Sequence, residues 1–384
     1  MNRKTILVIY EYFHPGFKAG GPVQSLVNLI GALNTEYEFK VMTSAFDMGE
    51  SIPYPDVALN AWNEVVLASQ KNVTVWYAGS KNMTFTGMFK IITEANPDII
   101  FISGLFTKWS SYPLVLQRVG KLKNVRMIIS PRGMLQAGAL QLKPLKKKLF
   151  LNAFKLTGLF RSVRWHATGE EETRDIKQII GPQVEVDVAA NIPKQPISSI
   201  TATNKKKGEL HLTYLSLIAE KKNLLLLLKA LKKVRAKISL SIYGPVKDEA
   251  YWRRCEEEMK DLPKNCCVVY KGLVTPEKVQ DTLQEYHALI SLTQGENFGH
   301  ALYESLSTGR PLITSYYTPW NNLEEEKAGW NVAIGDELEI ILLLEKIAAM
   351  SGETFNEYGE GAWRLAKKYY MESDFQQSYR KLFA

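Results

Sequence analysis

The chain has 384 residues, of which 46% are hydrophobic and 23% are charged, so it is long enough for two folded domains. This composition excludes a disordered or collagen-like chain. The three cysteines, Cys255, Cys266 and Cys267, provide neither a disulfide framework nor the paired CxxC motifs of a zinc knuckle. The apolar run after MNRK is too short for a signal peptide, and no stretch approaches the ~20 apolar residues of a membrane span, so we expect a soluble, cytoplasmic protein.

The net charge of +8 lies entirely in the N-terminal half. Residues 1–200 contain 23 Lys and Arg against 15 Asp and Glu, a net charge of +8, whereas residues 201–384 contain 25 of each, a net charge of zero. Between Asp98 and Glu170 there are 13 basic residues and no acidic residue. This part of the chain is expected to attract anions.

Short β-branched runs alternate with helix-length segments in the first half, as in a parallel sheet covered by helices. A glycine-containing loop and a helix with apolar residues from Val23 to Leu33 follow the first run. The predicted strands are 5–10, 39–44, 73–78, 98–104, 125–131 and 163–168.

A linker is predicted at 191–208, where Pro, Ser, Thr and Lys replace the apolar period. A second series of predicted strands follows, at 210–216, 237–244, 266–272, 287–293 and 311–315. We therefore expect an N-terminal Rossmann-like domain at 1–192 and a C-terminal one at 205–365. The run of five leucines at 224–228 is interpreted as a buried helix face.

The most specific motif is QGENFGHALYESLSTGRPLITS at 294–315, which places Glu296 and Glu304 eight positions apart. On a helix starting near Asn297 this spacing is just over two turns, so both carboxylates can point to one ligand. The free N–H groups of such a helix suit a phosphate. An ordinary amphipathic helix with two solvated glutamates is the alternative.

This motif resembles the signature of retaining glycosyltransferases of the GT-B fold, family four, in particular members that build bacterial surface polysaccharides. The resemblance implies an α/β fold of two Rossmann-like domains facing across an interdomain cleft, with the N-terminal domain on the acceptor side. It also implies that the C-terminal helix, about 370–384, packs back on the N-terminal domain and that the C-terminal domain binds the nucleotide sugar.

The resemblance further assigns roles to the residues of the motif. Glu296 would lie by the donor sugar, and Glu304 would accept hydrogen bonds from the nucleotide ribose. Backbone N–H groups around Asn297, Phe298, Gly299 and His300 would face the diphosphate. His300 is either a donor-sugar contact or a satisfied surface histidine.

Two further elements match the family in part. Gly20–Gly21 resembles its N-terminal glycine pair, which lets the backbone approach the diphosphate; a simple turn is the alternative. In LSLIAEKKN, Lys222 matches a diphosphate-binding lysine, but Leu217 stands where relatives have an arginine. Lys221 and Lys222 could instead be a solvated helix start.

The segment IISPRGMLQAGAL brings Arg132 to a strand end, where many relatives have a histidine. Arg132 is interpreted as a diphosphate or acceptor contact, since an arginine cannot act as a base at neutral pH. The alternative is an arginine that pairs with a helix C-terminus.

No metal or cofactor is expected. The sequence has no Asp-x-Asp triplet and no HxxxH or HExxH spacing among its five histidines. Without Mg²⁺, cations and amide dipoles must neutralise the leaving diphosphate, which is the task proposed for Lys222, the Gly20–Gly21 loop and the helix after Glu296.

The segment 140–160 combines leucines with a lysine cluster, Lys143, Lys146, Lys147 and Lys148. Such a basic amphipathic stretch can lie on the anionic inner face of the plasma membrane, and the resemblance implies a glycan or polyprenyl-diphosphate-linked acceptor. A solvated basic helix is the alternative. No recognition motif for nucleic acid accompanies the charge.

The sequence thus predicts a retaining, metal-independent glycosyltransferase that moves a hexosyl-type sugar from a nucleoside-diphosphate sugar in surface-polysaccharide biosynthesis. Glu296, Lys222 and Arg132 are its candidate catalytic residues. A nucleotide-sugar epimerase of the same fold, or a catalytically silent sugar-nucleotide-binding partner subunit, remains the alternative.

Overall fold

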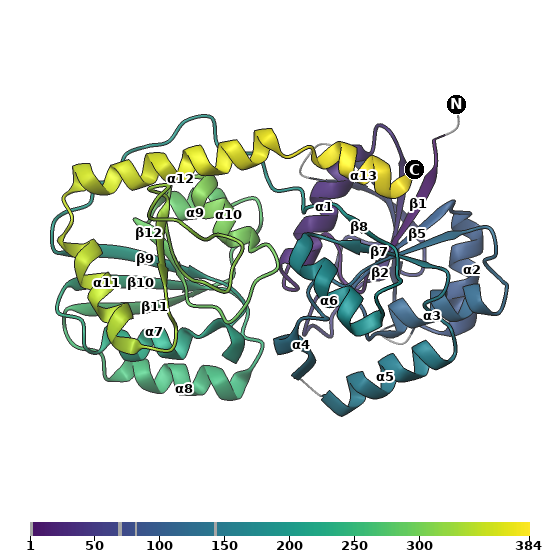
Figure 1. Ribbon diagram of the computed structural model, residues 1–384, viewed down its shortest axis with the longest axis horizontal. Coiled ribbons are helices and arrows are strands. Elements are labelled where there is room, and N and C mark those ends of the chain that lie inside the picture. The colour runs from purple at the N-terminus through teal and green to yellow at the C-terminus, as the bar shows by residue number, and fades with distance from the viewer. Residues whose placement is uncertain (1–2, 68–70, 81–82, 142–143) are drawn as a thin grey trace. The chain divides into compact units, whose positions relative to one another are not determined.

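The computed structural model describes residues 3–67, 71–80, 83–141 and 144–384, which divide into two compact units (Figure 1). The N-terminal unit comprises Met1–Ile192 together with Asp374–Ala384, and the C-terminal unit comprises Pro193–Ser373. Each unit is a sheet with helices on both of its faces.

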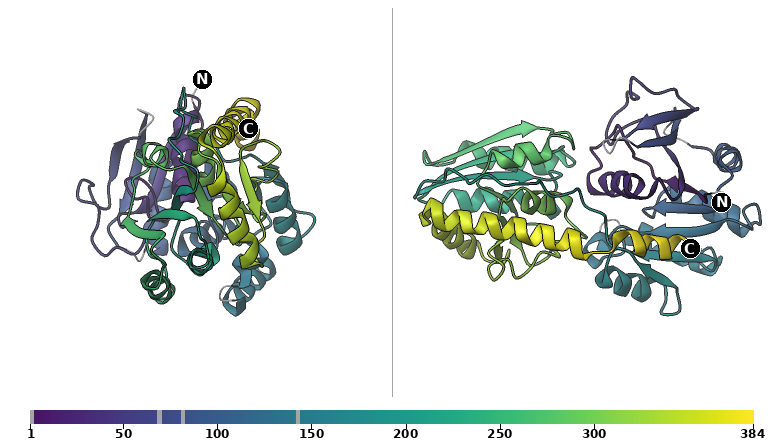
Figure 2. Two further views of the ribbon diagram at one scale, coloured as in Figure 1. Left: turned by 90° about the vertical axis from the view of Figure 1, so that its left-hand side faces the viewer. Right: turned by 90° about the horizontal axis from the view of Figure 1, so that it is seen from above.

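The sheet of the N-terminal unit has the strand order β3-β4-β2-β1-β5-β6-β7-β8. Neighbouring strands are parallel except β3, which pairs antiparallel with β4. Figure 2 shows the ribbon from two further sides. The strands are β1 (Thr5–Ile9), β2 (Glu38–Ser44), β3 (Trp62–Val66), β4 (Asn72–Ala78), β5 (Ile99–Ser103), β6 (Arg126–Ser130), β7 (Val163–Ala167) and β8 (Val186–Val188).

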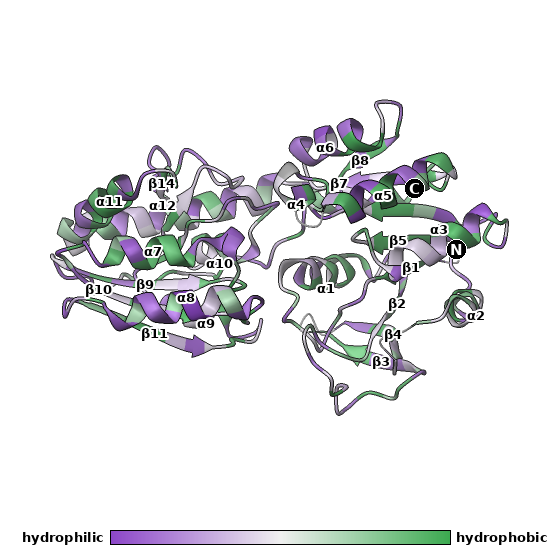
Figure 3. Ribbon diagram, turned by 90° about the horizontal axis from the view of Figure 1, so that it is seen from below, coloured by the Kyte–Doolittle hydropathy of each residue, from purple (hydrophilic) through white to green (hydrophobic). Residues whose placement is uncertain are grey.

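Seven helices are described in this unit: α1 (Gly21–Leu33), α2 (Phe85–Ala95), α3 (Lys108–Arg118), α4 (Ala137–Gln141), α5 (Pro144–Leu156), α6 (Glu170–Ile180) and α13 (Phe375–Phe383). The central strands are apolar on both faces, as the five buried residues of β5 show, because helices cover both sides (Figure 3).

Helix α13 belongs to the N-terminal unit although it ends the chain. The ring of Phe383 lies 5.9 Å from that of Phe101 on β5 and 6.3 Å from that of Phe39 on β2. The Nζ of Lys4 and the Nη2 of Arg126 donate hydrogen bonds to the Phe383 carbonyl at 3.1 and 2.7 Å. The last residues of the chain are therefore part of the N-terminal core.

The C-terminal unit has a six-stranded parallel sheet of order β11-β10-β9-β12-β13-β14. Helices α7, α8 and α11 share one buried cluster, while α9, α10 and α12 share another. The strands are β9 (Glu209–Leu215), β10 (Lys237–Tyr243), β11 (Cys266–Gly272), β12 (Ala288–Ser291), β13 (Leu312–Ser315) and β14 (Gly329–Val332). The helices are η1 (Glu220–Lys222), α7 (Leu224–Leu231), α8 (Glu249–Lys260), α9 (Val279–Gln284), α10 (His300–Ser307), α11 (Glu337–Ala349) and α12 (Gly352–Glu372).

All eleven predicted strands occur within two residues or so of their expected ends, but β3, β8 and β14 were not predicted. β3 is a half-exposed edge strand, and β8 and β14 have only three and four residues. Such short or exposed strands carry too little apolar pattern to be recognised.

Among the described residues no helix has the length and apolar character needed to cross a membrane.

Each sheet contains one point where the direction of strand addition reverses. In the N-terminal unit the reversal separates β1 from β5, and in the C-terminal unit it separates β9 from β12. The loops that leave two such strands diverge, so ligands of open α/β sheets bind at the carboxyl ends of these strands. The candidate site residues follow β1, β6, β9 and β12.

Candidate functional site

In the C-terminal unit, the loops after β9 and β12 meet at the reversal point. The Nζ of Lys222 forms an ion pair with the Oε1 of Glu296, and the two side chains are only 15% and 20% exposed. The backbone N–H of Gln294 donates to the Lys221 carbonyl at 2.9 Å, and the Nδ2 of Asn223 donates to the Leu292 carbonyl at 2.9 Å. The predicted lysine and the predicted first glutamate are therefore held together.

Glu296 does not lie on the helix that carries Glu304, so the prediction of a helix starting near Asn297 is wrong. Helix α10 begins at His300, preceded by Gly299 with a φ of 75° in the left-handed region. The Glu296 N–H donates to the Tyr317 carbonyl at 3.0 Å, which fixes this residue in the loop. The glycine's left-handed φ lets the chain turn sharply into the helix, which a larger residue would resist.

Phe298 anchors the loop by packing. Its side chain is 6% exposed, and its ring lies 4.9 Å from that of His300 and 5.7 Å from that of Trp320. The Nε1 of Trp320 donates to the Phe298 carbonyl at 2.8 Å. What this segment offers a ligand is therefore the first-turn N–H groups of α10, where no acidic residue is present. Asn297 has interaction partners in the protein, as His300 does.

Glu304 is the buried carboxyl group of α10. Its side chain is 6% exposed, and burial raises the pKa of its carboxyl group to about 7. The positive charge of Lys194 acts in the opposite direction but has a smaller effect on this pKa. Near neutral pH the group therefore changes between a neutral acid that can donate a hydrogen bond and a carboxylate that only accepts.

Lys221 and Lys247 add positive charge near Lys222. Burial lowers the pKa of Lys221, and Lys222 and Lys247 act in the same direction. The Lys247 N–H donates to the Ile218 carbonyl at 3.1 Å, next to Leu217. The backbone of Lys247 thus lies beside the position where the expected arginine is missing, and its charge acts on Lys221. Its only sequence signal is its place after the strand KISLSIY.

In the N-terminal unit, Gly20 caps helix α1 after the loop that follows β1. Gly20 has a φ of 73°, and a Cβ built on it would meet no atom within 4 Å. The backbone conformation of this residue thus requires glycine. The close approach to a diphosphate that the sequence predicted concerns a ligand, and it stays a prediction. Asp47 holds the loop, since its Oδ2 accepts from the N–H groups of Phe17 and Lys18 at 3.0 and 3.2 Å. Helix α1 starts at Gly21 and has no acidic residue in its first turn.

Arg132 follows β6 with a φ of 55°, an uncommon conformation for a side-chain-bearing residue. Its Nη1 donates to the Oδ1 of Asn191. The guanidinium carbon lies 6.0 Å from the centroid of the Phe101 ring, and the group also interacts with the buried side chain of Tyr379 on α13. Arg132 therefore has interior partners within the N-terminal unit. The predicted alternative, pairing with a helix C-terminus, is not what the structure shows.

The loop around Arg132 is held by Glu172, which the sequence analysis did not identify. Glu172 is 2% exposed, and its Oε1 accepts from the Gly133 N–H at 2.6 Å. Its Oε2 accepts from the N–H and the hydroxyl of Thr168, both at 2.8 Å. A run of three glutamates directly after a predicted strand, ATGEEE, was the available signal.

His166 lies under the same loop as a neutral, fully buried residue. Its ring nitrogens lie 2.8 Å from the Ser130 hydroxyl and 2.8 Å from the Ala189 carbonyl. Burial, assisted by the Arg132 charge, lowers its pKa to about 3. The group packs against Tyr379 of α13, whose ring lies 5.5 Å away. His166 therefore supports the loop and does not titrate near neutral pH.

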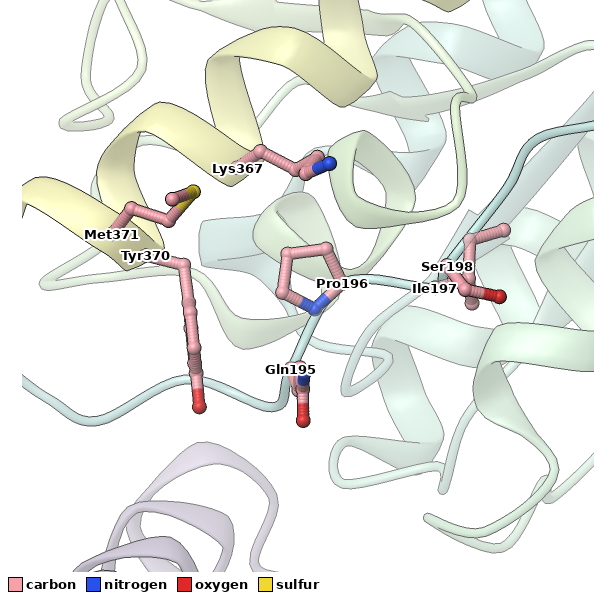
Figure 4. A pocket seen from close by; sticks show the side chains of 7 residues that line it. All are labelled: Gln195, Pro196, Ile197, Ser198, Lys367, Tyr370 and Met371. Carbon is pink, nitrogen blue, oxygen red and sulfur yellow. The ribbon is translucent and has the colours of Figure 1, made fainter.

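A hollow of about 310 Å³ lies elsewhere in the C-terminal unit, between the segment 195–198 and α12 (Figure 4). The charged residue that lines this hollow is Lys367, whose Nζ lies 4.1 Å over the Trp363 ring, and the rest of the lining is mainly apolar.

Within the described part of the chain, no three His, Cys, Asp or Glu side chains come together as a metal site.

Residues 209–349, which contain Lys222, Glu296 and Glu304, match the model of the family described as glycosyl transferases group 1. No curated protein matches the chain in sequence. The C-terminal unit thus carries the sequence pattern of that family.

Solved structures resemble the chain over almost its whole length. Sucrose-phosphate synthase from Thermosynechococcus elongatus is 14% identical with a TM-score of 0.73, covering 99% of each chain. HepE from Anabaena, solved in complex with UDP and glucose, is 12% identical with a TM-score of 0.71, covering 99% of this chain and 98% of its own. WaaG, described as a glycosyltransferase involved in lipopolysaccharide biosynthesis, is 12% identical with a TM-score of 0.64, covering 98% of both chains. The chain therefore has the GT-B fold, with a glycosyl transferases group 1 domain at residues 209–349.

Proposed function

We propose that this protein is a glycosyltransferase that moves a hexosyl-type sugar from a nucleoside-diphosphate sugar to a glycan or lipid-linked acceptor with retention of configuration. The observation that carries the proposal is the junction of the β9 and β12 loops. There Lys222, Glu296 and the start of α10 lie together in the segment that matches glycosyl transferases group 1.

Each group has a chemical task in this proposal. Lys222, Lys221, Lys247 and the α10 N–H groups stabilise the diphosphate as it leaves. Glu296, whose carboxylate already pairs with Lys222, binds hydroxyls of the donor sugar, and Glu304 binds the ribose hydroxyls. Arg132 binds a phosphate or a polar group of the acceptor.

In the proposed reaction the bond from the anomeric carbon to the diphosphate oxygen breaks as the acceptor oxygen attacks from the same face. The acceptor proton passes to an oxygen of the departing diphosphate, so no protein nucleophile and no metal ion is needed. UDP-glucose is the first donor to test, because HepE was solved with UDP-glucose.

We also propose that α5 contacts an anionic membrane surface where a lipid-linked acceptor resides. Leu145, Leu149 and Leu156 are 82%, 72% and 87% exposed on this helix, and Lys146 and Lys148 are exposed beside them. Lys143, part of the predicted cluster, lies outside the described residues. Lys147 instead donates to the Ala139 carbonyl at 2.5 Å.

The test is a thermal-shift and calorimetric screen of the full chain against UDP, GDP, ADP, CMP and dTDP, with and without EDTA. One nucleoside diphosphate should raise the melting temperature in both buffers. Lys222→Ala should weaken its binding by about tenfold or more, because a charge-assisted contact is lost. Lys232→Ala, which removes a surface cation paired with Glu258 in the same unit, is the matched control and should have no effect.

Turnover is then followed with the matching nucleotide sugar. A transferase releases nucleoside diphosphate when acceptor is added, whereas an epimerase interconverts the free nucleotide sugar. Retention is read from the anomeric proton coupling of the product. Absence of binding to every nucleotide by a folded sample would overturn the proposal.

A further inference from the structure

The side chain of Arg132 is surrounded by elements that are far apart in the sequence. Arg132 follows β6, whereas Phe101 belongs to β5, Asn191 to the segment after β8 and Tyr379 to α13. The Nη1 of Arg132 donates to the Oδ1 of Asn191, and its guanidinium carbon lies 6.0 Å from the centroid of the Phe101 ring. All of these elements belong to the N-terminal unit (Figure 1). The place of this guanidinium group is therefore set by tertiary contacts.

Tyr379 reaches Arg132 from the last helix of the chain. Tyr379 is 1% exposed, and its ring lies 5.5 Å from that of His166 and 6.0 Å from that of Phe383. Burial raises the pKa of the Tyr379 hydroxyl, whereas the charge of Arg132 and a side-chain hydrogen bond with it act in the opposite direction. Close packing fixes the tyrosine ring, so its hydroxyl is held beside the guanidinium group.

The backbone at Arg132 is held by the buried carboxylate of Glu172. Arg132 and Gly133 have φ angles of 55° and 74°, so two successive residues are left-handed, a conformation that is unfavourable for Arg132. The Oε1 of Glu172 accepts from the Gly133 N–H at 2.6 Å, and its Oε2 accepts from the Thr168 N–H at 2.8 Å. Because a backbone N–H only donates, a glutamine at this position would set its amide nitrogen against one of these two groups.

The stability of α6 does not by itself account for the place of Glu172. The helix begins with three glutamates, and acidic side chains in a first turn are favourable there. Glu170 and Glu171 are exposed, whereas Glu172 is 2% exposed and reaches a loop 39 residues earlier in the chain. Burial of a carboxylate is costly unless hydrogen bonds compensate for it, so the place of Glu172 reflects the loop that it holds.

Both the backbone and the side chain of Arg132 are thus fixed before any ligand binds. A free arginine side chain has many rotamers, and their loss on binding weakens the affinity for a ligand. A guanidinium group that is already held avoids this loss and presents its N–H groups in one orientation. The contacts around Arg132 are those expected of a preorganised binding group.

We infer that Glu172 and Tyr379 are positioning residues, which set the backbone and the guanidinium group of Arg132 for its ligand. The inference rests on the proposed function for the ligand of Arg132, whereas the positioning is independent of it. It makes α13, the last helix of the chain, part of the site on the N-terminal unit.

The first experiment observes the Arg132 side chain directly. The Nε–H signals of the full chain are recorded by NMR after isotopic labelling of arginine, and the signal that disappears in Arg132→Lys is assigned to Arg132. Tyr379→Phe and Glu172→Gln should both shift this signal. Tyr37→Phe is the matched control, because the Tyr37 ring also packs on α13, 5.4 Å from that of Phe383, and it should leave the signal in place.

The second experiment asks whether the two residues act through Arg132. Turnover is the release of nucleoside diphosphate from the matching nucleotide sugar, with the octyl glycosides of glucose, galactose and mannose as acceptors and with water alone. Arg132→Ala should lower kcat/KM about tenfold, and Tyr379→Phe about fivefold, the effect of one hydrogen bond. Glu172→Gln should lower it about tenfold. In the Arg132→Ala background neither further change should matter, because residues that act through one group are not additive.

Three results would overturn the inference. The Arg132 signal stays in place in both Tyr379→Phe and Glu172→Gln, or their losses of turnover are the same with and without Arg132, or Arg132→Ala keeps full turnover. Tyr379→Phe decides the matter where Glu172→Gln does not fold, because it removes one hydroxyl group and keeps the ring.

The proposed function can fail separately. If the Arg132 signal moves as expected and no nucleotide binds to the folded chain, the positioning stands and the transferase proposal is wrong. If nucleotides bind and turn over while the signal stays in place, the transferase proposal stands and the positioning is wrong. In a chain without turnover the NMR experiment alone decides the positioning.

Discussion

Glu304 shows how one residue's burial can set the pH dependence of a site. Its carboxyl group is 6% exposed on α10, and burial raises its pKa to about 7. Above an ordinary pKa of 4.5 the unfolded chain is ionised while the folded chain still holds the proton. Stability from this group is therefore greatest below pH 4.5 and is lost as pH rises to about 7.

The same titration should govern nucleotide affinity. Ribose hydroxyls donate to a carboxylate, so binding of UDP should strengthen about tenfold between pH 6 and pH 8, as the ionised fraction of Glu304 rises. Glu304→Gln should remove this part of the pH dependence and leave only the part due to the phosphate itself. Calorimetry at five pH values measures both profiles, and parallel profiles would contradict the assignment.

The orientation of the Arg132 side chain depends on neighbours that are distant in sequence. Asn191 holds one guanidinium nitrogen, and Glu172 holds the following Gly133 N–H. The neutral His166 lies beneath the same loop. SPRGM predicted a functional arginine, but only the tertiary contacts show which side chains surround it.

At the scale of elements, α5 differs from the other helices in what it exposes. Helix α11 also exposes leucines, Leu338 and Leu342, at 58% and 60%, but acidic residues begin it. On α5 the exposed leucines stand beside exposed lysines. Apolar and cationic groups together are typical of a helix that lies in the headgroup region of an anionic membrane.

Replacement of Leu145, Leu149 and Leu156 by serine should therefore reduce binding to vesicles containing phosphatidylglycerol by about tenfold or more, since each buried CH₂ contributes about 0.8 kcal/mol. Co-sedimentation with phosphatidylglycerol and with phosphatidylcholine vesicles measures the effect. The Leu338→Ser, Leu342→Ser double variant is the control. Binding that is equal for both lipids, or equal in all variants, would show that α5 is a solvated helix.

At the scale of the whole molecule, each unit contains a buried neutral histidine. Burial with the Arg132 charge lowers the pKa of His166 to about 3, and burial with His211 and Lys205 lowers that of His287 to about 4. The unfolded chain binds a proton near pH 6.5, whereas the folded chain does not. This contribution to stability is present above pH 6.5 and is lost as pH falls toward 4.

Between pH 7.5 and pH 5.0 each histidine should cost about 2 kcal/mol of stability. His166→Gln should remove this loss from the N-terminal unit, and His287→Gln should remove it from the C-terminal unit. Hydrogen exchange read by mass spectrometry reports the two units separately. An unchanged pH slope in either variant would mean that the corresponding histidine is protonated in the folded protein.

The sequence by itself determined the alternating architecture, and it predicted the residues of the candidate site. Continuous β-branched runs specified eleven strands, because strands buried on both faces must be apolar throughout. The motif around Glu296 and the KKN turn with Lys222 predicted a phosphate-binding part of the C-terminal unit, and the structure joins Lys222 to Glu296.

Only the tertiary structure decided where these groups point. Gly299 starts α10 at His300, so Glu296 lies in a loop, and Glu304 is buried enough for its pKa to move. The places of Lys247 and Glu172 follow from contacts with segments far away in sequence. Local sequence patterns indicate which faces of a helix or strand are apolar. The burial, pairing and orientation of polar groups depend on long-range contacts, which a local pattern does not specify.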